Sequence, residues 1–233
     1  MRKRKFLNRL SPNEYSLYGE IVMDEGYKWS DDDVCPSDVL EMLREAGGND
    51  ILLHVNSPGG DVFSGFAIYN QLMAYPGKIM VKIEGLAASI ASVIVLAADE
   101  IIMPENAYMM IHRAWCYASG NAEELSKQAE ILEQIDKSML EVYQKRLNHP
   151  EDTDKLKDKI DAETWMNARE TAELFSGITV TKADKIAACA GAAAYLDMLG
   201  AKLPDGMKET DEQAQLEAQK MRMRLRLMEV EGE

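Results

Sequence analysis

Three short segments hold residue types that could do chemistry. Ser57-Pro-Gly-Gly60 lies at an expected strand-to-helix turn, where paired glycines let backbone N–H groups approach a ligand and the following helix favours negative charge. Gly85-Leu-Ala-Ala-Ser89 surrounds a serine with small residues at the start of an expected helix, which leaves its hydroxyl accessible. Tyr108-Met-Met-Ile-His112 places a histidine at the end of an apolar strand. A hydroxyl, an imidazole and free backbone donors are the groups that nucleophilic catalysis by serine requires.

Each of these segments also has an ordinary structural explanation. Glycine pairs are more often simple turns than ligand cradles, and Ser89 stands where a serine commonly caps a helix. A lone histidine that closes a strand, as His112 does, is more often structural than catalytic. Catalysis by a serine requires its hydroxyl and an imidazole within hydrogen-bond distance of each other. A hydroxyl is a poor nucleophile at neutral pH unless a base whose pKa lies near that pH removes its proton.

The elements that must position these segments alternate along the chain. An apolar run is followed by a turn, a capped helix and another apolar run, which is the pattern of βαβ units around a mostly parallel sheet. A further segment at about 122–147 has apolar residues at three- and four-residue steps and predicts a long amphipathic helix. Strands are expected at 15–23, 51–55, 79–84, 101–103 and 108–111, the turn at 56–60, and helices at 38–46, from 61 to about 74, and at 88–98.

Several motifs, in this order, make the sequence resemble the ClpP family of serine peptidases. The matching segments are Asn56-Ser-Pro-Gly-Gly60, Gly85-x-Ala-Ala-Ser89, Pro104-x-Asn106-x-x-Met109-Met-Ile-His112 and Glu163-x-Trp-Met-x-Ala168. Their order and approximate spacing match over residues 15–185. The resemblance implies an α/β fold of the ClpP/crotonase type, with stacked βαβ units and a protruding handle helix at about 122–147.

The resemblance also assigns roles to individual residues. The serine after Gly-x-Ala-Ala is the nucleophile of the family, which here is Ser89, and the histidine that closes the Met-Ile-His strand is its base, which here is His112. The backbone N–H groups of Gly60 and Ile90 correspond to the donors that bind the oxyanion of the tetrahedral intermediate. A carboxylate then fixes the tautomer of the imidazole and stabilises the imidazolium.

This third catalytic member is where the sequence departs from the family pattern. The family commonly has an aspartate at this position, and alignment on Trp165 and Ala168 places Glu163 there. Glutamate is one methylene longer but serves the same role in other Ser-His-Glu hydrolases. Asp161, two residues earlier, stays open as the alternative. Glu163 is favoured because an aromatic residue and an alanine fix the register.

The remaining candidate residues have simpler explanations. His54 lies inside an expected strand and is interpreted as a packed strand residue, and His149 precedes a proline in a loop. His112 and Cys116 are four residues apart, but two possible ligands without a visible third do not make a metal site. The sequence therefore predicts neither a metal nor a cofactor.

Composition narrows the class of protein further. Lys and Arg total 26 against 40 for Asp and Glu, a formal net charge of -14, which argues against nucleic acid or an anionic membrane surface as the main partner. Three cysteines do not form a disulfide framework, which favours a reducing cytoplasm. The longest apolar stretch, 87–98, contains two serines and is too short to cross a bilayer. The basic first residues are not followed by the apolar run of a signal peptide.

We expect three parts along the chain: an N-terminal segment at 1–14, a ClpP-like peptidase domain at 15–200, and a charged, helical or flexible tail at 201–233. The resemblance implies an endopeptidase that cleaves protein or peptide substrates inside a homo-oligomeric chamber of two stacked heptameric rings. Contacts between the rings are expected from residues around Ile131 to Leu140, including Ile135 and Met139. Its place would be the bacterial cytoplasm or a phage prohead, with an AAA+ unfoldase or phage capsid and portal proteins as possible partners. The Glu-x-Trp-Met variant, the short start and the charged tail resemble phage or prophage head-maturation proteases more than the housekeeping subunit.

Two other classes of function stay open. The same fold serves crotonase-type acyl-CoA enzymes, in which paired backbone donors hold a thioester enolate. That function leaves Ser89 and His112 without a role. A catalytically silent scaffold or regulatory subunit would be expected to have lost one of these two residues, and both are present.

Overall fold

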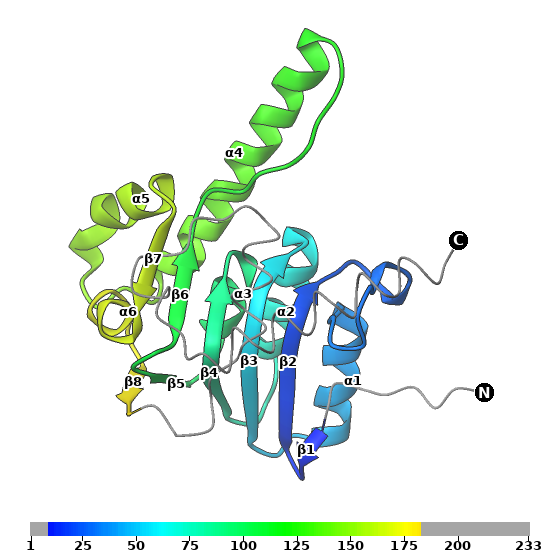
Figure 1. The fold of residues 1–233 in the computed structure, drawn as a ribbon, viewed down its shortest axis with the longest axis vertical. Helices are drawn as coiled ribbons and strands as arrows, with labels where there is room; N and C mark the ends of the chain where they lie inside the picture. The colour runs from blue at the N-terminus through cyan, green and yellow to red at the C-terminus, as the bar shows by residue number, and fades with distance from the viewer. Residues whose placement is uncertain (1–8, 183–233) are drawn as a thin grey trace, which may run out of the picture. The chain divides into compact units, whose positions relative to one another are not determined.

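The computed structural model describes residues 9–182, which form a mostly parallel sheet covered by helices (Figure 1). The strand order is β1-β2-β3-β4-β5-β8, while β6 pairs with the end of β4 and β7 pairs with β6. All pairs are parallel except β1 with β2 and β6 with β7. The strands are β1 Arg9–Ser11, β2 Glu14–Ile21, β3 Ile51–Gly60, β4 Ile79–Ala88, β5 Glu100–Pro104, β6 Tyr108–Ile111, β7 Thr164–Asn167 and β8 Ile178–Thr181. The α/β fold predicted from the sequence is confirmed.

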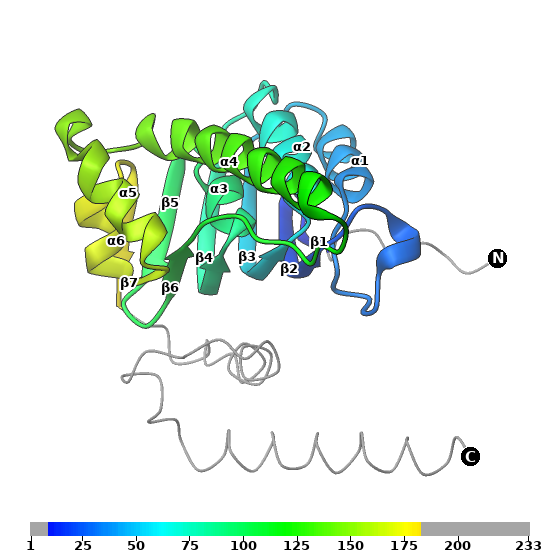
Figure 2. The same cartoon turned by 90° about the horizontal axis from the view of Figure 1, so that it is seen from above.

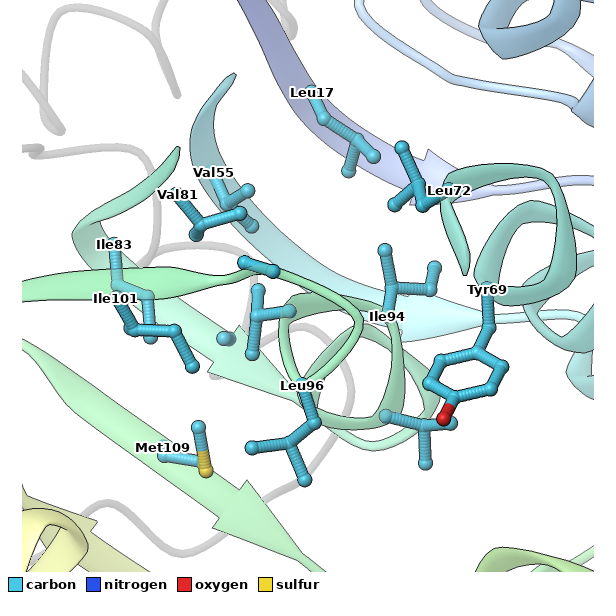
Figure 3. Close-up of a cluster of buried hydrophobic side chains, with 14 of the residues drawn as sticks. Leu17, Val55, Tyr69, Leu72, Val81, Ile83, Ile94, Leu96, Ile101 and Met109 are labelled. Atoms are coloured by element: carbon cyan, nitrogen blue, oxygen red, sulfur yellow. The ribbon is translucent and has the colours of Figure 1, made fainter. Parts of the chain in front are cut away.

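The core forms where alternate residues of the central strands meet the helices. Figure 3 shows Val55 of β3, Val81 and Ile83 of β4 and Ile101 of β5 in one cluster with side chains from the helices. All four of these side chains are fully buried. Because side chains alternate between the two faces of a strand, odd-numbered apolar residues on these strands share one face.

Helices α1 (Pro36–Ala46), α2 (Val62–Met73) and α3 (Ile90–Val95) cover that face of the sheet (Figure 2). α2 begins where the sequence predicts, because the carboxylate of Asp61 accepts a 2.8 Å hydrogen bond from the backbone N–H of Ser64. All residues of α3 are buried. A helix this short is held by packing rather than by its own hydrogen bonds.

Two strands extend further than the sequence pattern predicts. The 56–60 segment is not a turn, since β3 continues through it to Gly60 and pairs with β2. The ladder is irregular there, with a register shift in β2 between Tyr18 and Glu20. Likewise, β4 runs through Gly85 to Ala88, so the helix expected at 88–98 is shortened to α3. Pairing with neighbouring strands outweighs the weak strand propensity of glycine in both places.

The long helix α4 (Ala122–Gln144) projects from the body of the protein, as Figure 1 shows. Its N-terminus is closed by a capping box between Asn121 and Glu124. The helix ends three residues before the predicted end at 147. Only its C-terminal half packs on the domain, through Ile135, Met139, Val142 and Tyr143.

The last described part of the chain consists of short elements that the sequence pattern did not predict: α5 (Thr153–Asp161), β7, α6 (Ala168–Leu174) and β8. The predicted domain end at 200 and the predicted tail at 201–233 lie outside the described residues. Within residues 9–182, no helix is long and apolar enough to span a bilayer.

Candidate active site

Ser89 and His112 are brought together by the pairing of two strands. Ser89 lies between the end of β4 and the start of α3, and His112 follows the last residue of β6. β4 and β6 are parallel neighbours, with Ala88 opposite Met110. The hydroxyl oxygen of Ser89 lies 2.8 Å from Nε2 of His112, within hydrogen-bond distance. This is the geometry in which an imidazole can remove the proton of a hydroxyl.

The backbone of Ser89 has an unusual conformation. Its φ is 54° and its ψ is -130°. Residues other than glycine rarely adopt this combination, which costs on the order of 1–3 kcal/mol. Ser89 packs directly against the backbone of Gly59. Only glycine allows this approach, because a Cβ on Gly59 would lie 2.7 Å from the Cβ of Ser89. Strain of this kind tends to collect at functional sites, and here it lies at the residue that contacts His112.

The surroundings of His112 favour the form of the imidazole that acts as a base. Burial lowers the pKa of His112 below its usual value, while the carboxylates of Glu163 and Asp136 act in the opposite direction. The net shift of the pKa is downward, so the ring is neutral at neutral pH. A neutral imidazole has one ring nitrogen free to accept a proton.

Glu163 faces His112 because β6 and β7 are antiparallel. Ile111 pairs with Thr164, so His112, the residue after β6, and Glu163, the residue before β7, stand opposite each other. Oε2 of Glu163 lies 4.0 Å from Nδ1 of His112, which is ion-pair distance but too long for a hydrogen bond. Glu163 has a φ of 51°, and its side chain is about half exposed.

Asp161 occupies a different position. Its carboxylate lies 3.6 Å from Nε of Arg113, the residue after His112, and its side chain is 63% exposed. Arg113 also donates a 2.8 Å hydrogen bond to Asp136 of α4, and the N–H of Ala114 donates one of 2.7 Å to the same carboxylate. Asp136 therefore holds the chain directly after His112, and sequence reasoning missed it because the contact joins segments 22 residues apart.

The two predicted oxyanion donors are Ile90, the residue after Ser89, and Gly60, the residue after Gly59. Ile90 is the first residue of α3, and the N–H of a first helical residue has no acceptor within its own helix. Gly60 follows Gly59, the glycine that lies against Ser89, and has a φ of 143°. A Cβ at Gly60 would collide with the backbone of Ile21, so only glycine fits there.

The serines nearest to Ser89 in the motifs have structural contacts. Ser57 is fully buried and donates a 2.6 Å hydrogen bond to the carbonyl of Gly19. Ser92 is also fully buried, and its hydroxyl lies 2.5 Å from the carbonyl oxygen of Ser89 and 2.7 Å from the hydroxyl of Tyr143. Neither hydroxyl is accessible to a substrate. The involvement of Tyr143 had no signal in the sequence, because it lies 51 residues from Ser92.

The other histidines lie where the sequence predicts. His54 is a buried strand residue whose ring nitrogens lie 2.8 Å from carboxylates of Glu14 and Glu84. His149 is exposed, 3.9 Å from Glu151. In the part of the chain that the structure describes, no three His, Cys, Asp or Glu side chains are grouped so that they could hold a metal ion.

The chain is similar to known Clp proteases. The family model of the Clp protease matches residues 20–177. An ATP-dependent Clp protease proteolytic subunit 3 of Rhodococcus jostii is 29% identical over 126 residues, covering 53% of this chain and 61% of that protein. The ATP-dependent Clp protease proteolytic subunit of Bacteroides thetaiotaomicron is 32% identical over 130 residues, covering 54% of this chain and 57% of that protein. The ATP-dependent Clp protease proteolytic subunit 1 of Protochlamydia amoebophila is also 32% identical over 130 residues, covering 54% of this chain and 62% of that protein.

The chain thus spans about three fifths of the length of the curated relatives it matches. The family match covers more than half of the chain, runs from the end of β2 to just beyond α6, and includes Ser89, His112 and Glu163. The chain belongs to the Clp protease family.

Proposed function

We propose that this protein is a serine endopeptidase in which Ser89 is the nucleophile, His112 the general base and Glu163 the carboxylate that supports the imidazolium. The 2.8 Å contact between Ser89 Oγ and His112 Nε2 carries the proposal. It joins a strained, strand-to-helix serine to a partly buried histidine with a lowered pKa. A structural cap would require neither the strain nor the imidazole.

The chemistry follows from this geometry. As Ser89 Oγ attacks the carbonyl carbon of a peptide bond, Nε2 of His112 takes the hydroxyl proton, and a tetrahedral oxyanion forms. The N–H groups of Ile90 and Gly60 stabilise that oxyanion. His112 then gives the proton to the leaving amine, and the C–N bond breaks. A water molecule, deprotonated by the same imidazole, hydrolyses the acyl-enzyme and regenerates Ser89.

The carboxylate of Glu163 acts on the charged intermediate. Its charge opposes the effect of burial on the pKa of His112 and stabilises the imidazolium that exists between the two proton transfers. Shortening the 4.0 Å separation by about 1 Å in the substrate complex would form a hydrogen bond to Nδ1. Active-site hydrogen bonds are often long without substrate and tighten when it binds.

A fluorophosphonate probe tests the proposal directly. We expect the probe to phosphonylate Ser89, and we expect Ser89→Ala to lose both labelling and peptide cleavage. Ser138→Ala is the matched control and should keep both labelling and cleavage, because Ser138 is exposed on α4 and its hydroxyl bonds to the carbonyl of Gln134 rather than to a histidine. Peptide mapping that finds the adduct on Ser57 or Ser92 would contradict the assignment.

We further propose that the site works inside a homo-oligomeric chamber of two stacked heptameric rings. The support is a set of large apolar side chains that are exposed on α4 and on the segment before it: Trp115, Tyr117, Leu125 and Ile131. Such a group on a projecting helix needs a partner that covers it. Light scattering should give a mass many times the 26.1 kDa of one chain, and a monomer that cleaves peptides at full rate would contradict the chamber.

For the biological setting we propose head maturation in a phage or prophage, with capsid or portal proteins as the substrates. The departure from the family pattern at Glu163, followed by Trp165 and Met166, supports this assignment. Genes for portal and major capsid proteins beside this gene are the expected observation. An adjacent AAA+ unfoldase gene would instead favour general protein degradation.

A further inference from the structure

The side chain of Tyr143 reaches the active site from within the core. It lies near the C-terminal end of α4, is fully buried, and its ring packs against Phe175 with the ring centroids 5.9 Å apart. Its hydroxyl lies 2.7 Å from Oγ of Ser92, which in turn lies 2.5 Å from the carbonyl oxygen of Ser89. A chain of two hydrogen bonds therefore joins the long helix to the backbone of Ser89.

The direction of both hydrogen bonds is determined by their partners. A carbonyl oxygen only accepts, so the hydroxyl of Ser92 donates its single proton to Ser89. The hydroxyl of Tyr143 must then donate to Ser92. Burial raises the pKa of Tyr143, so the phenol keeps its proton and remains a donor throughout the neutral range.

These bonds act on the peptide plane between Ser89 and Ile90. The carbonyl of Ser89 also accepts a 3.0 Å hydrogen bond from the N–H of Ser92, so two donors fix its direction. In a planar trans peptide, the C=O of one residue and the N–H of the next point in opposite directions. Holding the carbonyl of Ser89 in the core therefore turns the N–H of Ile90 away from the core, toward the side on which an oxyanion would form.

The strain at Ser89 makes this support important. A residue with a φ of 54° and a ψ of -130° relaxes unless its surroundings hold it. Rotation of the Ser89–Ile90 peptide would release the strain, and it would move the N–H of Ile90 out of line. The two hydrogen bonds from Ser92 oppose that rotation, and Tyr143 holds the hydroxyl of Ser92 in the orientation that makes one of them.

We propose that Tyr143 and Ser92 are positioning residues that lock the Ser89–Ile90 peptide so that the N–H of Ile90 points at the developing oxyanion. The inference rests on the proposed peptidase function and adds two residues to its site. Neither residue touches the substrate. Both act through the backbone of Ser89.

Removal of the Tyr143 hydroxyl tests the lock. In Tyr143→Phe we expect kcat for a peptide substrate to fall roughly tenfold while KM stays within about twofold. Complete loss of one oxyanion donor lowers kcat by roughly 10² to 10³, and here the N–H of Ile90 is only turned, not lost. The acid limb of the pH profile should not move, because His112 is untouched. Ser92→Ala should show the same pattern, and the double variant should lose no more than the larger single loss, since both act through one chain of bonds.

Tyr75→Phe is the matched control. It also removes a tyrosine hydroxyl that donates a hydrogen bond, 2.7 Å to the carbonyl of Asn49, but it does so at the N-terminal end of β3. We expect this variant to keep its kcat. Thermal unfolding of all variants, measured in parallel, separates a loss of folded protein from a loss of turnover per folded molecule.

Failure of the inference can be told from failure of the proposed function. Wild-type protein that does not react with a fluorophosphonate at Ser89 would contradict the peptidase function itself. Wild-type protein that reacts, together with folded Tyr143→Phe and Ser92→Ala variants of unchanged kcat, would overturn the lock alone. Losses in kcat that add fully in the double variant would also overturn it, because the two residues would then act independently.

Discussion

The backbone N–H of Ser89 donates a 3.0 Å hydrogen bond to the carbonyl of Met110, two residues before His112. This bond continues the β4–β6 ladder by one step beyond the last paired residues. The serine is thereby attached to the strand that carries the histidine. The distance between the two side chains is fixed by backbone pairing rather than by flexible loops, which suits a site that must be preorganised.

The lowered pKa of His112 predicts the acid limb of the pH profile. His112 must be neutral to accept the proton of Ser89, so activity falls as the pH drops through the pKa of the imidazole. Because burial lowers that pKa below the usual value of 6.5, we expect the midpoint of kcat/KM against pH to lie below 6.5. A midpoint above 6.5 would contradict this account of the site.

Asp136→Asn should move the same limb. The charge of Asp136 raises the pKa of His112, and its removal should shift the midpoint of the profile to lower pH. The segment after His112 would also lose a carboxylate that accepts hydrogen bonds from Arg113 and Ala114, so a decrease in kcat is expected as well. Glu130→Gln, on the exposed part of the same helix, serves as control and should leave both quantities unchanged.

The two candidate carboxylates predict opposite results. Glu163 lies 4.0 Å from the imidazole, so we expect Glu163→Gln to lower kcat by a factor of up to about 10⁴, the loss known for an orienting carboxylate turned into its amide. Asp161 pairs with Arg113 at 3.6 Å and is exposed, and such pairs contribute roughly 0–1 kcal/mol. Asp161→Asn should therefore stay within about fivefold of wild type. A larger loss in Asp161→Asn than in Glu163→Gln would transfer the role to Asp161.

A pair of substitutions tests the packing around Ile90, the proposed oxyanion donor next to Ser89. Gly65 on α2 faces Ile90, and a Cβ at Gly65 would collide with the side chain of Ile90. We expect Gly65→Ala to lower the free energy of unfolding by about 1–3 kcal/mol and to reduce kcat by displacing Ile90. Adding Ile90→Ala removes the colliding atoms. It should restore part of the free energy of unfolding, measured by chemical denaturation, and part of kcat, measured by steady-state kinetics. A double variant that is worse than the sum of its parts would contradict this packing.

Much of the sheet could be predicted from apolar runs. β6 coincides with the predicted strand at 108–111, because a short apolar run bounded by turn residues and followed by a polar residue leaves few alternatives. β7 could not be predicted, since Thr164–Asn167 has no alternating pattern and becomes a strand through its pairing with β6. The glycines at 59 and 60 predicted a turn, but parallel pairing with β2 keeps them in a strand.

The site was predictable to the extent that motifs carried it. Motif order predicted Ser89, His112 and Glu163 as site residues, and in the structure Oγ of Ser89 and Oε2 of Glu163 lie near different ring nitrogens of His112. Tyr143 and Asp136 were not found, because their contacts depend on how α4 packs on the domain. Apolar periodicity along α4 shows that one face is buried, but it does not tell which hydroxyl or carboxylate meets the active site.

The structure divides the apolar stripe of α4 into an exposed N-terminal half and a buried C-terminal half. Ile135 and Met139, which the sequence placed among contacts between rings, are buried against their own domain, with 8% and 3% exposure. Leu125 and Ile131 are 43% and 46% exposed and remain available for a partner. The expected ring contacts therefore move toward the N-terminal half of α4.

Charged substitutions should separate these two roles. Leu125→Asp and Ile131→Asp should reduce the mass measured by light scattering while changing the free energy of unfolding of the subunit by no more than about 0.5 kcal/mol, because both side chains are exposed within it. Ile135→Asp and Met139→Asp should destabilise the subunit itself by about 3 kcal/mol or more, since each replaces a packed apolar side chain with an unpaired charge. If Leu125→Asp and Ile131→Asp leave the assembly intact, α4 does not join the rings, because these are the two large apolar side chains that α4 exposes.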